Sequence, residues 1–221
     1  MAKKKPTSSH LCSPLKPRSP GQEIYMDALN QYKIVFCLGV PGSGKTALAI
    51  SHGVQQYLDG KFKKIILCRP AISSEDFGYL PGMARQKLEP FLVPLFDELY
   101  RYFDRCTLEK KIKEGEIEIL PLAYARGRTL KDSFVIVDEA SNATRAQLIM
   151  MLTRFGHGSQ MVLVGDPSQS DLGKKSRNDF EDMSKVLSHI SDIREIRLGP
   201  EDIQREPLVK EMLMMLGNPS V

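Results

Sequence analysis

Long apolar runs, paired cysteines and a secretory leader are all missing from this chain. No apolar run approaches the ~18 residues that a membrane-spanning helix needs, and the N-terminus lacks the apolar stretch of a signal peptide. The cysteines (Cys12, Cys37, Cys68 and Cys106) form no Cys-x-x-Cys pair, and few histidines lie near them. This spacing argues against a zinc site or a disulfide framework, so we expect reduced thiols, a cytoplasmic protein and no membrane partner.

Charge of one sign is not in large excess either. The formal net charge is +4, with 26% charged and 42% hydrophobic residues, which are ordinary values for a globular protein. A balance this mildly basic is only a weak sign of a polyanionic partner. The 221 residues suffice for one well-buried α/β domain but not for two motor domains, which usually need ~150 residues or more each.

The basic residues are unevenly placed. Residues 1–20 contain Lys3, Lys4 and Lys5 together with four prolines and little to bury. We predict a flexible basic arm there, either a solvated tail or an arm that binds nucleic acid. From residue 21 the composition becomes that of a folded domain, so residues 21–221 are expected to form a single domain.

Apolar periodicity predicts strands that alternate with helices. Apolar runs indicate strands at 34–38, 64–68, 116–120, 134–137, 161–164 and 194–198. Helical spacing indicates helices at 22–31, 46–58, 88–103, 144–156 and 207–216. A capping box of Thr144 with Gln147 begins the fourth helix, and Gly60 and Gly156 act as helix stops. This alternation is typical of an α/β fold with a mostly parallel sheet covered by helices on both faces.

One loop matches the complete phosphate-binding pattern G-x-x-x-x-G-K-[ST], and its place between a predicted strand and a predicted helix argues against a chance match. Glycines let successive backbone N–H groups face phosphate oxygens, and the positive end of the following helix points to the same place. Lys45 is expected to reach the β- and γ-phosphates of ATP, and Thr46 to offer its hydroxyl to Mg²⁺. The matching residues are Gly39, Val40, Pro41, Gly42, Ser43, Gly44, Lys45 and Thr46.

Two carboxylates follow the predicted strand at 134–137. Asp138 and Glu139 stand where a parallel sheet places its ligand-binding edge. Asp138 is suited to hold the metal or one of its waters, and Glu139 to orient and deprotonate a water for attack on the γ-phosphorus. A strand ending in Asp-Glu is by itself as often structural, but beside a complete phosphate loop it favours ATP hydrolysis.

The predicted strand at 161–164 ends in Gly-Asp-Pro-Ser-Gln, which brings Asp166 and Gln169 to the same edge. Gln169 is expected to hydrogen-bond the γ-phosphate or the attacking water. The alternative is that this segment only forms a turn, in which Asp and Pro are common.

These motifs and three further segments resemble those of PhoH-like proteins, including the short members carried by bacteriophages. The resemblance runs from about Gln22 to the C-terminal helix. It implies a RecA-like ATPase core related to the first motor domain of superfamily 1 helicases, with RNA or single-stranded DNA as the partner. For a phage-encoded chain it also implies the host cytoplasm. The segments are GVPGSGKT (39–46), RPAISSEDFGYLPG (69–82), KLEPFLVPLFDEL (87–99), PLAYARGRTL (121–130), VIVDEA (135–140) and VLVGDPSQSDL (162–172).

The same resemblance implies roles for residues outside the phosphate loop. Gln22 occupies the place of a glutamine that contacts the adenine edge, with Tyr25 packing nearby; the alternative for Gln22 is a surface residue at a helix start. Arg126 and Arg128, beside Tyr124, are expected to grip nucleic-acid phosphates or stack on bases, unless they are ordinary surface arginines. Members with an extra N-terminal RNA-binding module have more residues before the domain, so here nucleic-acid binding is expected from the core.

Hydrolysis also calls for positive charge beyond that of Lys45 and Mg²⁺. Two-domain helicases take an arginine from their second motor domain. A single-domain chain is therefore expected to take one from a neighbouring subunit, in a homo-oligomeric ring that the resemblance suggests is a hexamer. The candidates are Arg177, Arg194, Arg197 and Arg205. Arg205 is preferred because the segment 202–207 resembles the family's segment before its last helix.

The sequence therefore predicts Mg²⁺-dependent ATP hydrolysis coupled to binding, moving along, remodelling or unwinding RNA or single-stranded DNA. One alternative is a nucleotide-dependent binding switch or nuclease-associated factor. Another is a P-loop kinase, which is less favoured because the Asp-Glu strand end and the Gly-Asp-Pro-Ser-Gln segment suit attack by water better than transfer to an acceptor.

Overall fold

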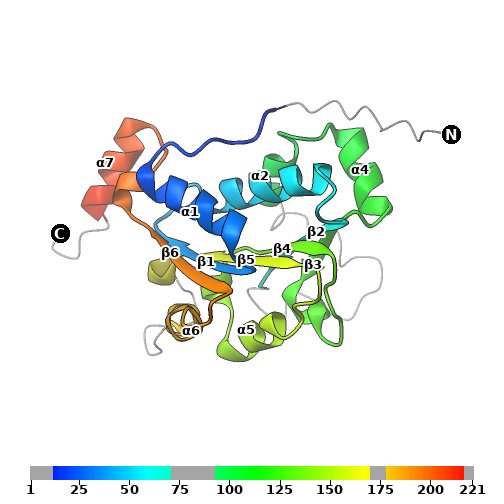
Figure 1. The fold of residues 1–221 in the computed structure, drawn as a ribbon. Helices are drawn as coiled ribbons and strands as arrows, with labels where there is room; N and C mark the ends of the chain where they lie inside the picture. Colours follow the sequence, from blue (N-terminus) through cyan, green and yellow to red (C-terminus); the bar gives the residue numbers. More distant parts are fainter. Residues whose placement is uncertain (1–11, 71–92, 170–177, 217–221) are drawn as a thin grey trace, which may run out of the picture.

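A six-stranded, all-parallel β-sheet forms the centre of the molecule (Figure 1). The computed structural model describes residues 12–70, 93–169 and 178–216. The strands are β1 (Ile34–Gly39), β2 (Lys64–Arg69), β3 (Ile117–Pro121), β4 (Ser133–Val137), β5 (Gln160–Gly165) and β6 (Ile193–Leu198). They lie in the order β3-β2-β4-β5-β1-β6, with every neighbouring pair parallel. The expected α/β fold with a mostly parallel sheet is confirmed.

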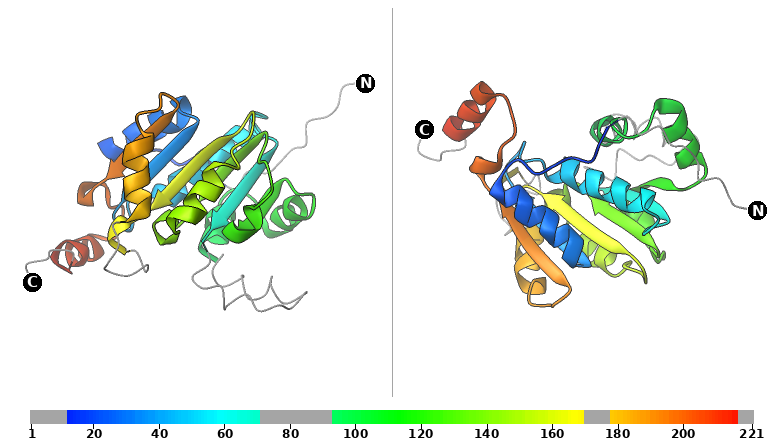
Figure 2. Two further views of the ribbon diagram at one scale, coloured as in Figure 1. Left: turned by 90° about the horizontal axis from the view of Figure 1, so that it is seen from below. Right: turned by 45° about the horizontal axis from the view of Figure 1, so that its top comes forward.

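Helices cover both faces of this sheet. Helices α1, α2 and α4 lie on one face and α5 and α6 on the other, while α7 stands at the periphery beyond the start of α1 (Figures 1 and 2). No helix in the described ranges is long and apolar enough to cross a bilayer. Their bounds are α1 (Pro20–Gln31), α2 (Lys45–Leu58), α4 (Arg105–Lys113), α5 (Arg145–Leu152), α6 (Asp179–Leu187) and α7 (Pro207–Leu216), and short 3-10 turns are η2 (Leu122–Ala125), η3 (Ala140–Asn142), η4 (Pro167–Gln169) and η5 (Pro200–Asp202).

The central strands are buried along their whole length because both of their faces are covered. All five residues of β4 and all six of β5 are buried. One core cluster lies between the sheet and helices α1, α2 and α4, and a second lies between the sheet and α5 and α6. Burial on both faces is the usual environment of parallel strands and accounts for their continuous apolar runs.

Most of the predicted elements are present within two residues of the predicted bounds, and the capping box of Thr144 with Gln147 is confirmed. The prediction that the fourth helix extends to Gly156 is wrong, because α5 ends at Leu152. The chain leaves the helix there to pair with residues after η2: the N–H of Leu130 donates to the carbonyl of Arg154 at 2.9 Å. The sequence analysis missed α4 and α6, and part of the predicted 88–103 helix lies outside the described residues; residues 93–99 are helical.

The segment before α1 contacts the domain. The backbone N–H of Leu15 donates to Ser51 Oγ of α2 at 2.7 Å, and the Leu15 side chain packs against the core. Ser19 is the N-cap of α1, accepting a hydrogen bond from the N–H of Gln22. The division of the chain at residue 20 into an arm and a domain stays a prediction. Residues 1–11 of the predicted arm lie outside the described residues.

Replacing Gly53 with alanine is expected to destabilise the protein, although the same change in most helices is stabilising by ~1 kcal/mol. Gly53 lies in α2, and a Cβ atom there would lie 2.4 Å from Cδ1 of the fully buried Phe134 of β4. Overpacking of this kind typically costs ~1–3 kcal/mol. Urea denaturation should therefore show a lower free energy of unfolding for Gly53→Ala but a change below ~0.5 kcal/mol for Gln56→Ala on the same helix. Equal or higher stability of Gly53→Ala would contradict this packing.

Candidate nucleotide site

A cavity of about 280 Å³ lies at the carboxyl ends of β1, β4 and β5. Because β5 lies between β4 and β1 in the sheet, the loops that follow all three strands meet there. Residues from three separate sequence motifs are thus brought together as expected. The residues lining the cavity include Pro41, Gly42, Gly44, Lys45, Thr46, Asp138, Glu139, Asp166, Gln169 and Arg205.

The phosphate loop connects β1 to α2, and the first turn of α2 faces the cavity. Gly42 and Gly44 have φ angles of +77° and +83°, which side chains rarely tolerate. Ser43 is fully buried and donates from Oγ to the carbonyl of Val40 at 2.8 Å. A loop closed in this way presents its backbone N–H groups and the N-terminus of α2 to an anion.

Lys45 points into the phosphate loop. Its Nζ donates to the carbonyls of Gly39 at 2.7 Å and Val40 at 2.8 Å. Burial lowers the pKa of Lys45, while the nearby Cys37 thiol and the carboxylate of Asp166 act in the opposite direction. The ammonium group is therefore held at the position where the β- and γ-phosphates of a nucleotide are expected.

The cavity offers oxygen donors suited to Mg²⁺. Thr46 Oγ1 donates to Asp138 Oδ1 at 2.7 Å, so a hydroxyl and a carboxylate meet at one point of the wall. Asp166 accepts through Oδ1 from the N–H and the hydroxyl of Ser168, while its buried Oδ2 has no hydrogen-bond partner in the described part of the chain. Within those same ranges no group of three or more His, Cys, Asp or Glu could hold a metal alone. This set fits Mg²⁺, which usually binds one or two carboxylates together with substrate phosphates.

Glu139 stands on strained backbone at the edge of the cavity. Its φ is +54°, in the left-handed region that non-glycine residues rarely adopt, and such strain clusters at functional sites. Arg69, at the end of β2, lies with Nη2 3.3 Å from Glu139 Oε1 and with Nε 3.6 Å from Asp138 Oδ2. Sequence analysis missed this bridging arginine. Its only signal was its position at the end of a predicted strand, and the adjacency of β2 to β4 was not readable.

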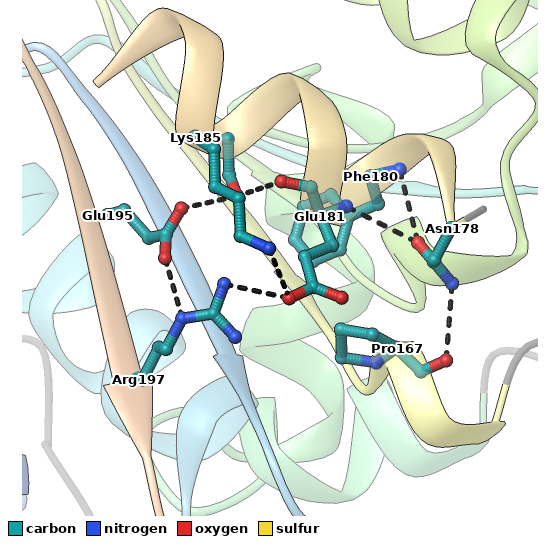
Figure 3. Close-up of polar contacts among 8 residues, drawn as sticks. Pro167, Asn178, Phe180, Glu181, Lys185, Glu195 and Arg197 are labelled. Carbon is teal, nitrogen blue, oxygen red and sulfur yellow. Dashed lines mark hydrogen bonds and ion pairs between the residues drawn. The ribbon is translucent and has the colours of Figure 1, made fainter. Parts of the chain in front are cut away.

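The loop after β5 carries Gln169 to the cavity and is tied to α6. The N–H of Gln169 donates to the carbonyl of Asp166 at 3.1 Å. Asn178, the N-cap of α6, donates from Nδ2 to the carbonyl of Pro167 at 3.3 Å and accepts through Oδ1 from the N–H of Phe180 (Figure 3). The exposed Gln169 is thus held at the cavity edge, and its expected contact with a γ-phosphate stays a prediction.

Gln22 and Tyr25 contact the phosphate loop, and the contact of Gln22 with adenine that the resemblance implies stays a prediction. Gln22 is 2% exposed; its Nε2 donates to the carbonyl of Ser43 at 2.9 Å, and its Oε1 accepts from the N–H of Arg18 at 2.8 Å. Tyr25 is fully buried, its hydroxyl donates to the carbonyl of Lys45, and burial raises its pKa. Because α1 packs beside α2, the phosphate loop covers the side chains of Gln22 and Tyr25, and their hydrogen bonds hold the loop.

The three residues expected to bind nucleic acid lie together near the carboxyl end of β3 but outside the cavity lining. Tyr124, in η2, is 58% exposed, and Arg126 is exposed just after it. Arg128, in contrast, forms a two-pronged ion pair with Glu118 of β3, with Nη1–Oε1 and Nη2–Oε2 distances of 2.5 and 2.9 Å. This pairing lowers the pKa of Glu118 and occupies the guanidinium. Tyr124 and Arg126 are therefore the two side chains of this group that are open to a partner.

The structure separates the four candidate arginines. Arg197 of β6 binds Glu195 Oε1 at 2.7 Å and Glu181 Oε1 at 3.1 Å, beside Lys185 (Figure 3). The guanidinium of Arg194 lies 5.8 Å from the centre of the Tyr32 ring. Arg177 lies outside the described residues. Arg205 lines the cavity of its own chain, and the expectation that it serves a neighbouring subunit stays a prediction.

A parallel α/β domain with a phosphate loop between β1 and α2 is a P-loop nucleotide-binding protein. Residues 14–216 match the family model described as PhoH-like protein, and the chain belongs to that family.

Several relatives share this similarity over most of the chain. PhoH-like proteins of Bacillus subtilis and Synechocystis sp. are 42% and 41% identical to it, over 90% and 87% of its length. Protein PhoH of Escherichia coli K12 is 32% identical over 91% of it. The aligned region covers 63%, 59% and 58% of these three relatives, so this chain matches only about three fifths of their length.

Among solved structures, the SWI2/SNF2 ATPase core of Sulfolobus solfataricus in complex with dsDNA matches 86% of this chain and 46% of its own, with 12% identity and a TM-score of 0.46. Nothing about partners or activity follows from so distant a likeness.

Proposed function

We propose that this chain is a Mg²⁺-dependent ATPase whose hydrolysis is coupled to binding, moving along or remodelling RNA or single-stranded DNA. The observation that carries the proposal is the meeting of Lys45, the Thr46–Asp138 pair and Glu139 around one cavity. A phosphate loop by itself is compatible with any P-loop protein, whether or not that protein hydrolyses ATP. Glu139 among the lining residues, next to Asp138, favours attack by water.

Each residue has a distinct task in this proposal. Lys45 and the loop N–H groups bind the β- and γ-phosphates, and Thr46 and Asp138 hold Mg²⁺, which when bound neutralises charge on the phosphate oxygens. Glu139 orients the attacking water and takes its proton. Gln169 contacts the γ-phosphate and makes the loop after β5 sensitive to the bound nucleotide.

The nucleic-acid part of the proposal is supported by exposed Tyr124 and Arg126, an aromatic ring and a cation of the kind that bind bases and phosphates of single strands. The homo-oligomer, which the family resemblance suggests is a hexamer, is a separate part of the proposal. The catalytic reason for it is an arginine supplied by a neighbouring chain, whereas the position of Arg205 at the cavity of its own chain supports action within one chain.

The test is ATP turnover with and without poly(U) and single-stranded DNA at two salt concentrations. We expect stimulation by polymer, and about three phosphate contacts predict a roughly twentyfold loss of polymer affinity between about 50 and 200 mM salt. Arg126→Ala should weaken stimulation, whereas Arg105→Ala, at an exposed position on α4, should not. Turnover that requires a small acceptor would indicate a kinase. Nucleotide binding without turnover, even with polymer present, would indicate a binding switch.

A further inference from the structure

The segment between β6 and α7 is anchored to the phosphate loop of its own chain. Asp202, which is 1% exposed, accepts hydrogen bonds from Ser19 Oγ at 2.6 Å and from the N–H of Gly199 at 2.8 Å. Two residues further on, the N–H of Gln204 donates to the carbonyl of Gly42 at 2.9 Å. These contacts tie the segment both to the N-cap of α1 and to the loop itself. The residue that follows is therefore placed by backbone contacts within one chain.

That residue, Arg205, packs against the phosphate loop. A Cβ atom on Gly42 would lie 2.9 Å from both Cγ and Nε of Arg205, so the Arg205 side chain lies closely over the loop at this glycine. Arg205 is the one arginine among the residues lining the cavity, and no carboxylate in the described part of the chain forms an ion pair with it. Arg197 and Arg128 are instead held by carboxylates. The exposed Arg205 side chain lines the same cavity as Lys45 and is therefore available to an anion bound there.

We propose that Arg205 acts in cis: it binds the γ-phosphate of the nucleotide held by its own chain, both before and during hydrolysis. This inference rests on the proposed ATPase function. In the reaction, the oxygen of water bonds to the γ-phosphorus while the bond from that phosphorus to the β–γ bridging oxygen breaks. ADP leaves with the electron pair of that bond, and the proton of the water goes to Glu139. Arg205 donates hydrogen bonds to γ-phosphate oxygens throughout and undergoes no covalent change.

A cis position predicts an effect on binding that a residue serving a neighbouring chain would not have. A hydrogen bond from a charged donor contributes about 1.5–3 kcal/mol, or roughly 10- to 100-fold in affinity. Arg205→Ala should therefore weaken binding of a non-hydrolysable ATP analogue by at least about tenfold at protein dilutions where the chain is monomeric, and leave ADP affinity unchanged. Gln204→Ala, an exposed neighbour whose backbone N–H is retained, should change neither affinity. Equal loss of ADP and analogue affinity would show a damaged loop and would overturn the proposal, as would no loss at all.

Mixing two inactive variants separates cis from trans action. An arginine finger is worth about 10³-fold or more in turnover, so Arg205→Ala and Lys45→Ala chains should each be nearly inactive. They are co-expressed with different tags, and association is checked by co-purification. If Arg205 acts in cis, the mixture has no more activity than the sum of its parts, whether or not the chains associate. Recovered turnover would mean that Arg205 of the Lys45→Ala chain serves its neighbour, and would overturn the inference. Wild-type protein that binds Mg²⁺·ATP without turnover would instead refute the proposed ATPase, and the affinity test above would still decide the position of Arg205.

Discussion

Glu139→Gln should remove nearly all ATP turnover while leaving ATP binding in place. The amide has almost the same shape as the carboxylate but cannot accept the proton of the attacking water, and general-base catalysis typically contributes ~10²–10⁴-fold. Lys45, Thr46 and Asp138, which bind the phosphates and Mg²⁺ in our proposal, are untouched. Steady-state turnover should therefore fall by at least about 100-fold, with nucleotide affinity within about threefold of wild type.

The matched control is Glu23→Gln, which makes the same chemical change at an exposed carboxylate in the first turn of α1. It should leave turnover unchanged. Turnover of Glu139→Gln within about threefold of wild type would mean that another group activates the water, and the strained backbone at Glu139 would then need a different explanation.

Lys45→Ala should abolish ATP binding at ordinary concentrations. The ammonium group of the half-buried Lys45 donates hydrogen bonds to the carbonyls of Gly39 and Val40 inside the loop, so water screens its charge only in part. Removing one partner from a buried, hydrogen-bonded charge pair typically costs ~2–5 kcal/mol, which here corresponds to a rise of ~30-fold or more in the dissociation constant of ATP. Titration calorimetry in the presence of Mg²⁺ measures the dissociation constant of ATP directly.

Lys131→Ala removes the same charge from an exposed position and should leave ATP affinity unchanged. The free energy of unfolding separates loss of binding from loss of fold, and we expect it to differ from wild type by less than ~1 kcal/mol because Lys45 is only half-buried. Retained ATP affinity in a folded Lys45→Ala protein would mean that the loop does not bind the nucleotide phosphates.

The parallel sheet and the position of the site were predictable because their signals are local. The strand β4 is apolar on both faces, and Asp138 and Glu139 follow it immediately in the chain. Parallel strands end at the same edge, so polar residues after three such strands meet once the strands are neighbours. The helix α4 was missed because its apolar residues are few: Leu108 is its buried residue, and charged side chains make up much of the rest. The helix α6 was missed although Phe180, Met183 and Leu187 stand at helical spacing.

The hydrogen-bond and ion-pair partners of long polar side chains could not be predicted from the sequence. Gln22 and Arg128 look equally available in sequence, yet one is enclosed by the phosphate loop and the other is paired with Glu118. Arg69 lies about 70 residues before the carboxylates that it bridges, and it reaches them only because β2 lies next to β4. Such pairings depend on strand order and on a few ångströms of side-chain placement, which no spacing rule encodes.

By itself the sequence determined that this chain has a phosphate loop between a strand and a helix and carboxylates at the ends of two further strands. These features follow from backbone conformation and from the burial of apolar runs, which neighbouring residues control. Only the tertiary structure decided which cations face the cavity: β6 lies beside β1, so the segment after β6 returns Arg205 to the loop of the same chain. The contact between Arg205 and Gly42 joins residues more than 160 positions apart, and only packing of the whole domain brings them together.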